Sequence, residues 1–130
     1  MNHNAAKLSQ LLVHLEMSYK FAQMKLAENN KTERDLRNRI ADLVNTQRGT
    51  PTLDAESKTE QSWAVMLRWQ HWIDDRVEQL NSELARVLAA KPELIVTVRN
   101  TLRKNESLKG VLENLQKNDK AQKMKKSLYD

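Results

Sequence analysis

Glycine, proline and cysteine are almost missing from this chain of 130 residues, which has two glycines, two prolines and no cysteine. So few turn-forming residues argue against a compact mixed domain and leave long helices as the remaining option. Aromatic residues make up 5% of the chain and no run rich in Val, Ile or Thr alternates at period two, so we expect no strands. Without cysteine, neither a disulfide framework nor a thiolate metal site can form.

Long apolar runs are lacking too. No stretch approaches the roughly 18 apolar residues of a membrane span, and the first residues, Met1-Asn2-His3-Asn4, lack the basic and apolar regions of a secretory signal. We therefore expect a cytosolic protein.

What the chain does have is an apolar stripe whose members are spaced alternately four and three residues apart, with one break near Gly49-Thr50-Pro51. An average spacing of 3.5 keeps one seam of a helix facing a partner helix. The first segment of this seam comprises Leu8, Leu12, Leu15, Tyr19, Ala22, Leu26, Asn29, Glu33, Leu36, Ile40, Leu43 and Gln47. The second comprises Trp63, Met66, Gln70, Ile73, Val77, Leu80, Leu84, Val87, Lys91, Leu94, Val98, Thr101, Asn105, Leu108, Leu112 and Leu115.

This pattern predicts an all-α fold, a long antiparallel two-helix coiled-coil hairpin that forms a single domain over residues 1–130. We expect helix one over about 4–48, a short turn over about 49–56 and helix two over about 57–126. Gly49 stands where a carboxyl cap is wanted, Pro51 cannot continue the helix, and Ser57 with Glu60 has the spacing of a capping box. Pro92 predicts a kink near residues 88–92, because the seam keeps its register through it; a restart of the helix at Pro92 is the alternative.

Folding such a hairpin at about residue 52 would pair Leu43 with the region of Gln61, and Leu8 with residues 92–100. The end of the second segment, with Leu108, Leu112 and Leu115 on one face, would then overhang without an intramolecular partner. It would either form a homodimer or insert into another protein. Eight basic and three acidic residues lie between Arg103 and Lys126, so this basic arm carries the whole net charge of +5 and favours an acidic surface.

All three tryptophans fall within ten residues, at Trp63, Trp69 and Trp72. Trp69 and Trp72 flank the seam one helical turn apart, so their indole rings can be covered only in part and would leave an apolar patch for a partner. The alternative is that they only wrap the seam. The polar seam residues Asn29, Glu33, Gln70, Lys91 and Asn105 either fix the register, mark a place where the helices splay or are simple imperfections.

No set of residues predicts catalysis. His3, His14 and His71 lack the spacing of metal ligands, and the adjacent Asp74 and Asp75 point about 100° apart on a helix. No nucleophile with a base, phosphate loop or cofactor motif is present, so we predict a non-enzyme without cofactor, metal or small-molecule substrate. Nucleic acid is a weaker candidate for the basic arm than a protein or an anionic membrane surface, because the arm has no aromatic residue among its lysines apart from Tyr129.

The two long helices, the short turn, the longer second helix and the lysine-rich arm resemble the FliJ family of flagellar export proteins and its YscO-type relatives in type III secretion. The most specific echo is Trp69-Gln70-His71-Trp72-Ile73, which is similar to an aromatic, polar, polar, aromatic, aliphatic run early in the second helix of that family. The resemblance implies that this run binds the membrane export gate. The implied gate surface is Leu36, Ile40, Leu43, Trp69, Trp72 and Ile73.

The resemblance further implies a stalk, similar to that of rotary ATP synthases, that enters a hexameric export ATPase and links it to the gate, with escort of export chaperones as a secondary role. The overhanging arm fits insertion into the ring. The expected ring-binding residues are Arg103, Lys104, Leu108, Lys109, Leu112, Leu115 and Lys117. Pro92 departs from this expectation because it would bend a stiff stalk. A self-associating coiled-coil scaffold outside secretion is the alternative function.

Overall fold

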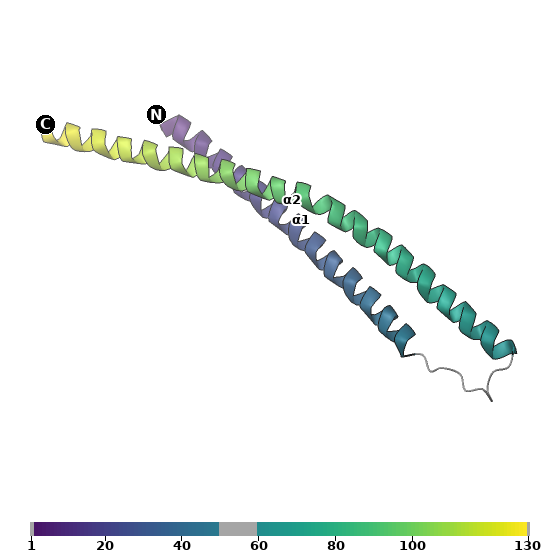
Figure 1. Ribbon diagram of the computed structural model, residues 1–130. Helices are drawn as coiled ribbons and strands as arrows, with labels where there is room; N and C mark the ends of the chain where they lie inside the picture. Colours follow the sequence, from purple (N-terminus) through teal and green to yellow (C-terminus); the bar gives the residue numbers. More distant parts are fainter. Residues whose placement is uncertain (1, 50–59, 130) are drawn as a thin grey trace. The chain divides into compact units, whose positions relative to one another are not determined.

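The computed structural model describes residues 2–49 and 60–129, which form two long helices, α1 (Asn2–Arg48) and α2 (Glu60–Tyr129) (Figure 1). Within these residues there is no strand. The two helices pack against each other in opposite directions, which confirms the expected all-α helical hairpin. Both helices extend two or three residues past the expected ends at residues 4 and 126, and α2 begins three residues later than expected.

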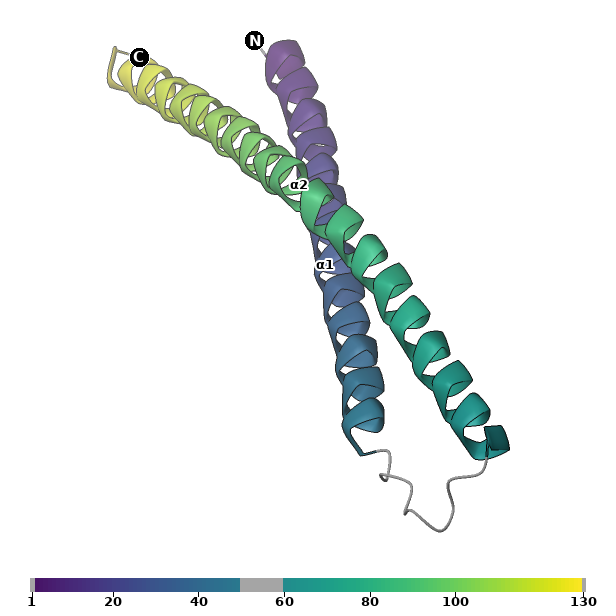
Figure 2. The same ribbon diagram turned by 45° about the vertical axis from the view of Figure 1, so that its right-hand side comes forward.

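By contacts, the chain divides into two compact units. One unit combines the described residues up to Ala27 with those from Glu93 onward, and the other comprises the described residues from Glu28 to Pro92. Each unit therefore contains a part of α1 packed on a part of α2. In the first of these units Glu16 of α1 lies beside Lys109 of α2, and toward their ends the purple part of α1 and the yellow part of α2 diverge (Figure 2).

The seam read from the sequence is the packed face of both helices. In α1 every seam position from Leu8 to Gln47 is buried or half-buried, and in α2 the same holds from Met66 to Leu112. The most deeply buried side chains are Ala22, Leu36, Ile73 and Leu80, and Ile73 is fully enclosed, with 0% of its surface exposed. The apolar area removed from water is the main favourable contribution to the pairing of these helices.

The register of the two helices differs from the one expected. Gln47 lies against Asp74 in one unit, and Glu16 against Lys109 in the other. Leu8 therefore lies opposite the stretch around Leu112 and Leu115, not opposite residues 92–100. The expected register was wrong because it assumed a fold at residue 52 with a short turn. The two helices are joined through residues 50–59, and Gln47, next to the end of α1, lies against Asp74, which is about four turns after the start of α2.

The ends of the helices next to this connection are only partly described. Gly49 directly follows the end of α1 at Arg48, where a carboxyl cap was expected. Its amide donates a hydrogen bond to the Asn45 carbonyl at 2.9 Å, and its φ is not positive, so it does not take the left-handed conformation of many glycine caps. Thr50, Pro51 and the Ser57 half of the expected capping box lie outside the described residues.

Pro92 lies inside α2, which continues without interruption on both sides of it. The alternative of a helix that restarts at Pro92 is therefore wrong. Because proline has no amide hydrogen, the Leu88 carbonyl loses its helical partner. Both Leu88 and Pro92 are exposed, so that carbonyl is on the side of the helix that water reaches. The boundary between the two units falls directly after Pro92, and the kink expected near residues 88–92 stays a prediction.

We expect Ile73→Ala to lower the free energy of unfolding by about 2–5 kcal/mol, since it removes a fully enclosed side chain and leaves a cavity. Leu67→Ala is the matched control, because Leu67 lies nearby on α2 but is half exposed. This substitution should change the free energy of unfolding by no more than about 0.5 kcal/mol. Urea titration followed by circular dichroism gives both values. Equal losses for the two variants would contradict the packing described here.

Replacement of Pro92 by alanine should stabilise the chain by about 1–3 kcal/mol, because it restores the amide donor for the Leu88 carbonyl and removes the steric conflict of the ring. The gain is expected to fall below the full cost of an interior proline, since proline also restricts the unfolded chain. Thermal unfolding of the two proteins measures the difference. An unchanged or lower melting temperature would show that the helix is already adapted to the proline.

Candidate interaction surfaces

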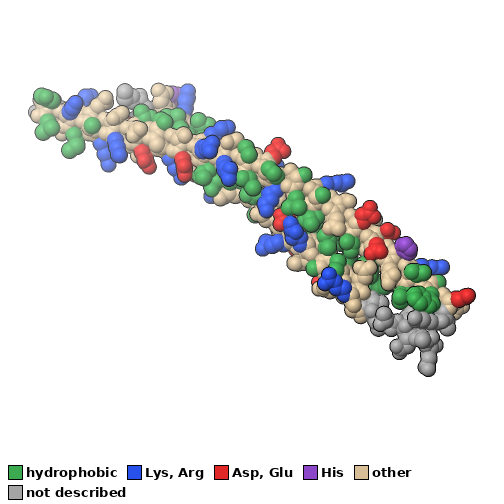
Figure 3. All heavy atoms as spheres, viewed as in Figure 1, with side chains coloured by type: hydrophobic (Ala, Val, Ile, Leu, Met, Phe, Trp, Pro, Cys, Tyr) green, Lys and Arg blue, Asp and Glu red, His purple; other side chains and the backbone are tan. Residues whose placement is uncertain are grey.

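An aromatic surface lies near the beginning of α2, within the unit that comprises the described residues from Glu28 to Pro92. Trp69 and Trp72 are 43% and 53% exposed, and their rings stack with centroids 5.4 Å apart and planes inclined by 15°. Val65, one turn before Trp69, is exposed on the same side of the helix. Hydrophobic side chains are visible at the surface of this end of α2 (Figure 3). An exposed stacked pair of indoles is the kind of group that dominates protein interfaces.

Trp69 and Trp72 lie beside the seam and not within it, and the register also places this stretch of α2 next to the end of α1. Gln47 Nε2 donates a hydrogen bond to Asp74 Oδ1 at 3.2 Å, and α1 ends one residue after Gln47, at Arg48. Since the helices are antiparallel, most of the residues of α2 before Asp74 have no residue of α1 opposite them. Trp63, a seam residue by spacing, is 40% exposed.

The structure separates the six residues expected to bind an export gate into two groups. Trp69 and Trp72 lie at the surface, whereas Leu36 and Ile73 are buried in the seam and Ile40 and Leu43 are half-buried. Leu36 is also eleven residues from Gln47, about 16 Å along the helix, so it does not lie beside the tryptophans. The gate surface stays a prediction; in this arrangement the buried members would act by holding the helix pair together.

The residues expected to bind an ATPase ring belong to the other unit. Leu108 lines a largely apolar groove together with Leu11, Leu15 and Val111, and Arg103, Lys104 and Ser107 also line it. Lys109 Nζ lies 3.9 Å from Glu16 Oε1, so α1 runs beside this part of α2. The overhang that was expected to contain Leu108, Leu112 and Leu115 therefore begins only beyond them. This correction follows from the register, which brings α1 to residues that a fold at residue 52 would leave bare.

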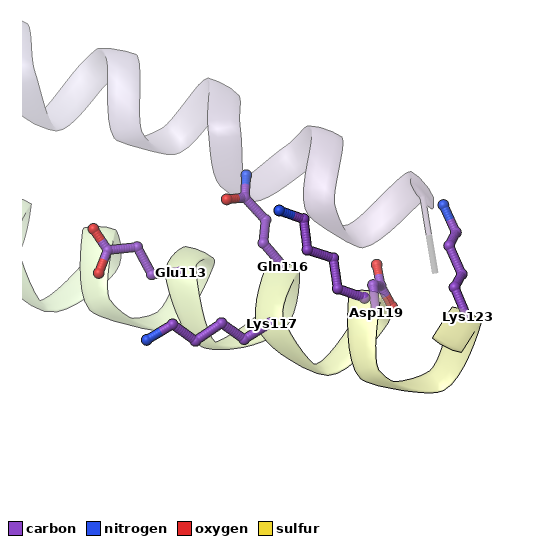
Figure 4. Close-up of a pocket in the computed structure, with 6 residues that line it drawn as sticks. Glu113, Gln116, Lys117, Asp119 and Lys123 are labelled. Carbon is purple, nitrogen blue, oxygen red and sulfur yellow. The ribbon is translucent and has the colours of Figure 1, made fainter. Parts of the chain in front are cut away.

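Lysines gather along α2 after Leu115. An open hollow of about 460 Å³ is lined by Glu113, Gln116, Lys117, Asp119, Lys120 and Lys123. The close-up shows Gln116 and Lys123 directed toward the neighbouring ribbon, and Glu113 and Lys117 along α2 (Figure 4). Because Lys117, Lys120 and Lys123 are exposed and outnumber the acids, this face presents positive charge to a partner. Of the expected ring-binding residues, Lys117 is the one that lines this hollow.

A second exposed apolar surface, not anticipated in the seam analysis, lies on α1. Val13, Met17, Phe21 and Met24 are each between 51% and 64% exposed. We call these four residues the outer stripe. The ammonium of Lys25 lies over the Phe21 ring, 4.7 Å from its centroid, and forms a cation–π contact beside the outer stripe. The spacing of four, four and three residues was the signal that could have predicted it, but the stronger seam on the same helix hides it.

The polar residues identified in the seam by spacing lie in the packed face between the helices, where several of them form hydrogen bonds or ion pairs. Asn29 Nδ2 donates a hydrogen bond to the Val87 carbonyl at 3.1 Å, and Lys91 Nζ lies 3.3 Å from Glu33 Oε1. Arg37 approaches the other oxygen of Glu33 at 3.4 Å. These cross-helix bonds favour the interpretation that the polar residues fix the register. In the other unit Asn105 is buried, and its side-chain oxygen accepts no hydrogen bond.

The same contacts act on the ionisation of Glu33. The hydrogen bond from Lys91, supported by the positive charges of Lys91 and Arg37, lowers the pKa of the Glu33 carboxyl below its ordinary value of 4.5, while desolvation opposes the shift. Because the carboxyl has a lower pKa in the folded chain than in the unfolded chain, its ion pair contributes stability above about pH 4.5. That contribution is lost as the pH falls through the folded-state pKa.

Among the described residues, no group of three or more His, Asp or Glu side chains is placed to hold a metal ion. His14 and His71 are both exposed. No described helix has an apolar stretch long enough to cross a bilayer. Comparisons of this chain with known protein families, with characterised proteins and with solved structures gave no match.

Glu33→Gln should lower stability at pH 7 by an amount that disappears on acidification. The variant keeps the size and polarity of the side chain but cannot pair with Lys91 as an anion. Unfolding curves of both proteins between about pH 7 and pH 3 measure the difference. We expect the curves to converge below the folded-state pKa of Glu33. A difference that stays constant over this range would mean that packing, and not charge, explains the role of Glu33.

Proposed function

We propose that this chain is a non-catalytic helical-hairpin adaptor that serves as the stalk of a flagellar-type, type III protein export apparatus. In this role it would link the hexameric export ATPase to the membrane export gate, at the cytoplasmic face of the inner membrane. Escort of export chaperones is a secondary role that the proposal includes. The observation that carries the adaptor function is the exposed, stacked pair Trp69 and Trp72.

Three features support an adaptor over an enzyme. The two helices bury one seam, so most of each helix surface is open to partners. The described part of the chain offers open hollows along the helices rather than an enclosed cavity with converging polar groups, which is the usual form of a catalytic site. The apolar surface of Trp69 and Trp72 and the lysine-rich face of residues 117–126 also differ in chemistry and lie in different units. Two unlike surfaces suit two unlike partners.

The assignment of these partners rests on the resemblance. The run from Trp69 to Ile73 supports the export gate as the partner of the aromatic surface. The lysine-rich face supports an acidic partner, and the export ATPase is the one that the resemblance provides. The corrected register changes this part of the proposal: Lys117 and the lysines that follow it are the better candidates for ring contacts, because Leu108 and Leu112 are already covered in part by α1.

The proposal predicts that two sets of substitutions separate two binding activities. With purified export ATPase and the cytoplasmic part of the gate protein from the same organism, Trp69→Ala/Trp72→Ala should weaken gate binding by a factor of about 30 or more, since interface tryptophans contribute about 2 kcal/mol or more. Binding to the ATPase should stay unchanged. Lys117→Glu/Lys120→Glu/Lys123→Glu should have the opposite effect. Isothermal titration calorimetry measures both.

Leu67→Ala is the control for the tryptophan variant, because Leu67 is exposed on another side of the same turns of α2. All these substitutions are at exposed positions, so circular dichroism should show unchanged helices. If the wild-type chain fails to bind the export ATPase, or fails to bind the gate protein, the stalk function is refuted. Binding of this protein to duplex DNA that falls steeply with salt would instead favour a nucleic-acid role for the lysine-rich face.

A further inference from the structure

The outer stripe of α1 is not accounted for by the hairpin or by the proposed function. On a helix with 100° per residue, Val13, Met17, Phe21 and Met24 fall within a band of about 80°, centred roughly 180° from the seam residues of the same turns. The packed face of α1 therefore points to α2, and the outer stripe points away from it. Burial of these four side chains requires another molecule.

The stripe has sharp limits along the helix. The same outward side of α1 carries Gln10 before Val13, and Glu28, Lys31, Asp35, Arg39 and Asp42 after Met24, all of them exposed. Single exposed apolar residues are common on protein surfaces. Four of them on one side of about three turns, followed by an entirely polar continuation, indicate a surface with a limited partner contact.

We propose that a second copy of this chain docks on the outer stripe, so that two α1 helices pack antiparallel about a two-fold axis. The positions of the four residues carry this orientation. When one helix is reversed about a point midway between Met17 and Phe21, Val13 comes opposite Met24 and Met17 opposite Phe21. Each copy then offers the same patch to the other, as a two-fold interface requires.

The charges beside the stripe favour the same arrangement. Lys20 and Glu16 lie on one flank of the stripe, and reversal of the second helix brings Lys20 of each copy close to Glu16 of the other. Two equivalent opposite-charge contacts result, of the kind that sets partner orientation in helical pairs. In a parallel two-fold pair this flank would face the opposite flank of the partner, which carries Lys25, so Lys20 would lie near a like charge and away from Glu16. Glu16 is free to respond, because its contact with Lys109 is long, at 3.9 Å, and both side chains are about half exposed.

The interface is small. The stripe spans about 18 Å of helix, and its four residues with their flanks are fewer than the 20–30 residues per partner of a standard stable complex. We therefore expect a weak, reversible dimer, with a dissociation constant on the order of 10–100 µM. Methionine and phenylalanine suit such a surface. The methionine side chain is flexible and the phenylalanine ring is flat, so both can pack against a partner that binds only weakly.

A bilayer surface is a poorer occupant of the stripe. Helices that lie in a bilayer interface have a broad apolar face and a strongly basic polar face. The outer stripe is narrow, extends over about three turns and is followed on the same side by residues of both charges, Glu28, Lys31, Asp35, Arg39 and Asp42. These features match a seam between helices better.

Sedimentation velocity of the full chain between about 10 µM and 500 µM tests the proposal. Wild type should shift from monomer to dimer over this range, and Met17→Gln/Phe21→Gln should weaken the association at least tenfold. Val96→Gln is the matched control, since Val96 is 52% exposed but lies on α2, outside the outer stripe and the aromatic surface. A wild type that stays monomeric throughout, or a dimer that the Met17 and Phe21 substitutions do not weaken, would overturn the proposal.

Two further measurements test the orientation. Glu16→Lys and Lys20→Glu should each weaken the dimer, and the double variant should recover most of the loss because it exchanges the charges. The chain has no cysteine, so introduced cysteines report contacts directly. Mixed Met17→Cys and Phe21→Cys proteins should form the mixed disulfide faster than either protein forms its own; faster formation of the disulfide between two Met17→Cys chains would overturn the antiparallel pair.

Discussion

The burial of one apolar seam per helix is the interaction on which the structure depends. Neither helix has a second element to cover it within its unit, so the pairing of α1 with α2 is what removes Leu36, Ile73 and Leu80 from water. A single seam buries much less area per residue than a globular core does. The removal of one enclosed side chain consequently takes away a large part of the free energy of unfolding. The polar residues within the seam also contribute a larger share of it than they would in a larger protein.

The seam also decides which surfaces remain open. Because each helix uses one side for pairing, any other apolar residues are left for other molecules. Two sets stand out: the aromatic surface with Trp69 and Trp72, and the outer stripe with Met17 and Phe21. They belong to different units and differ in chemistry, since stacked indoles form a rigid surface, whereas methionines form an adaptable one. This difference is the physical basis for assigning a specific partner to the first and a weak self-contact to the second.

The polar layer around Glu33 connects packing with electrostatics. Asn29, Glu33 and Lys91 replace apolar seam residues and lose hydrophobic stabilisation, but their bonds cross between the helices. A slide of one helix along the other would break these bonds, whereas apolar side chains tolerate new neighbours more easily. The register is thus held by directional contacts, while the apolar residues provide most of the free energy. The side-chain oxygens of Asn29 and of Asn105, which is buried in the other unit, both lack a hydrogen-bond partner, and Asn29 bonds across the helices through its Nδ2.

Much of the fold could be predicted from the sequence. The four-three spacing identified the seam residues of both helices, and the scarcity of Gly and Pro gave helix ends within three residues of those observed. The same periodicity could not fix the register, because every shift by one heptad preserves the apolar pattern. It also did not predict the outer stripe. On a helix with one strong seam, a second, shorter apolar stripe is found only when the direction of each side chain around the helix is considered.

The sequence by itself determined that this protein is a pair of long helices with a given face on each, because helical periodicity is a local property of the chain. Only the tertiary structure decided which seam residues are left exposed. Exposure depends on where α1 ends relative to α2, and the contacts of Gln47 with Asp74 and of Glu16 with Lys109 set that relation. They bring α1 beside Leu108, which the spacing alone placed in an overhang, whereas the exposure of Trp69 and Trp72 already followed from their positions beside the seam.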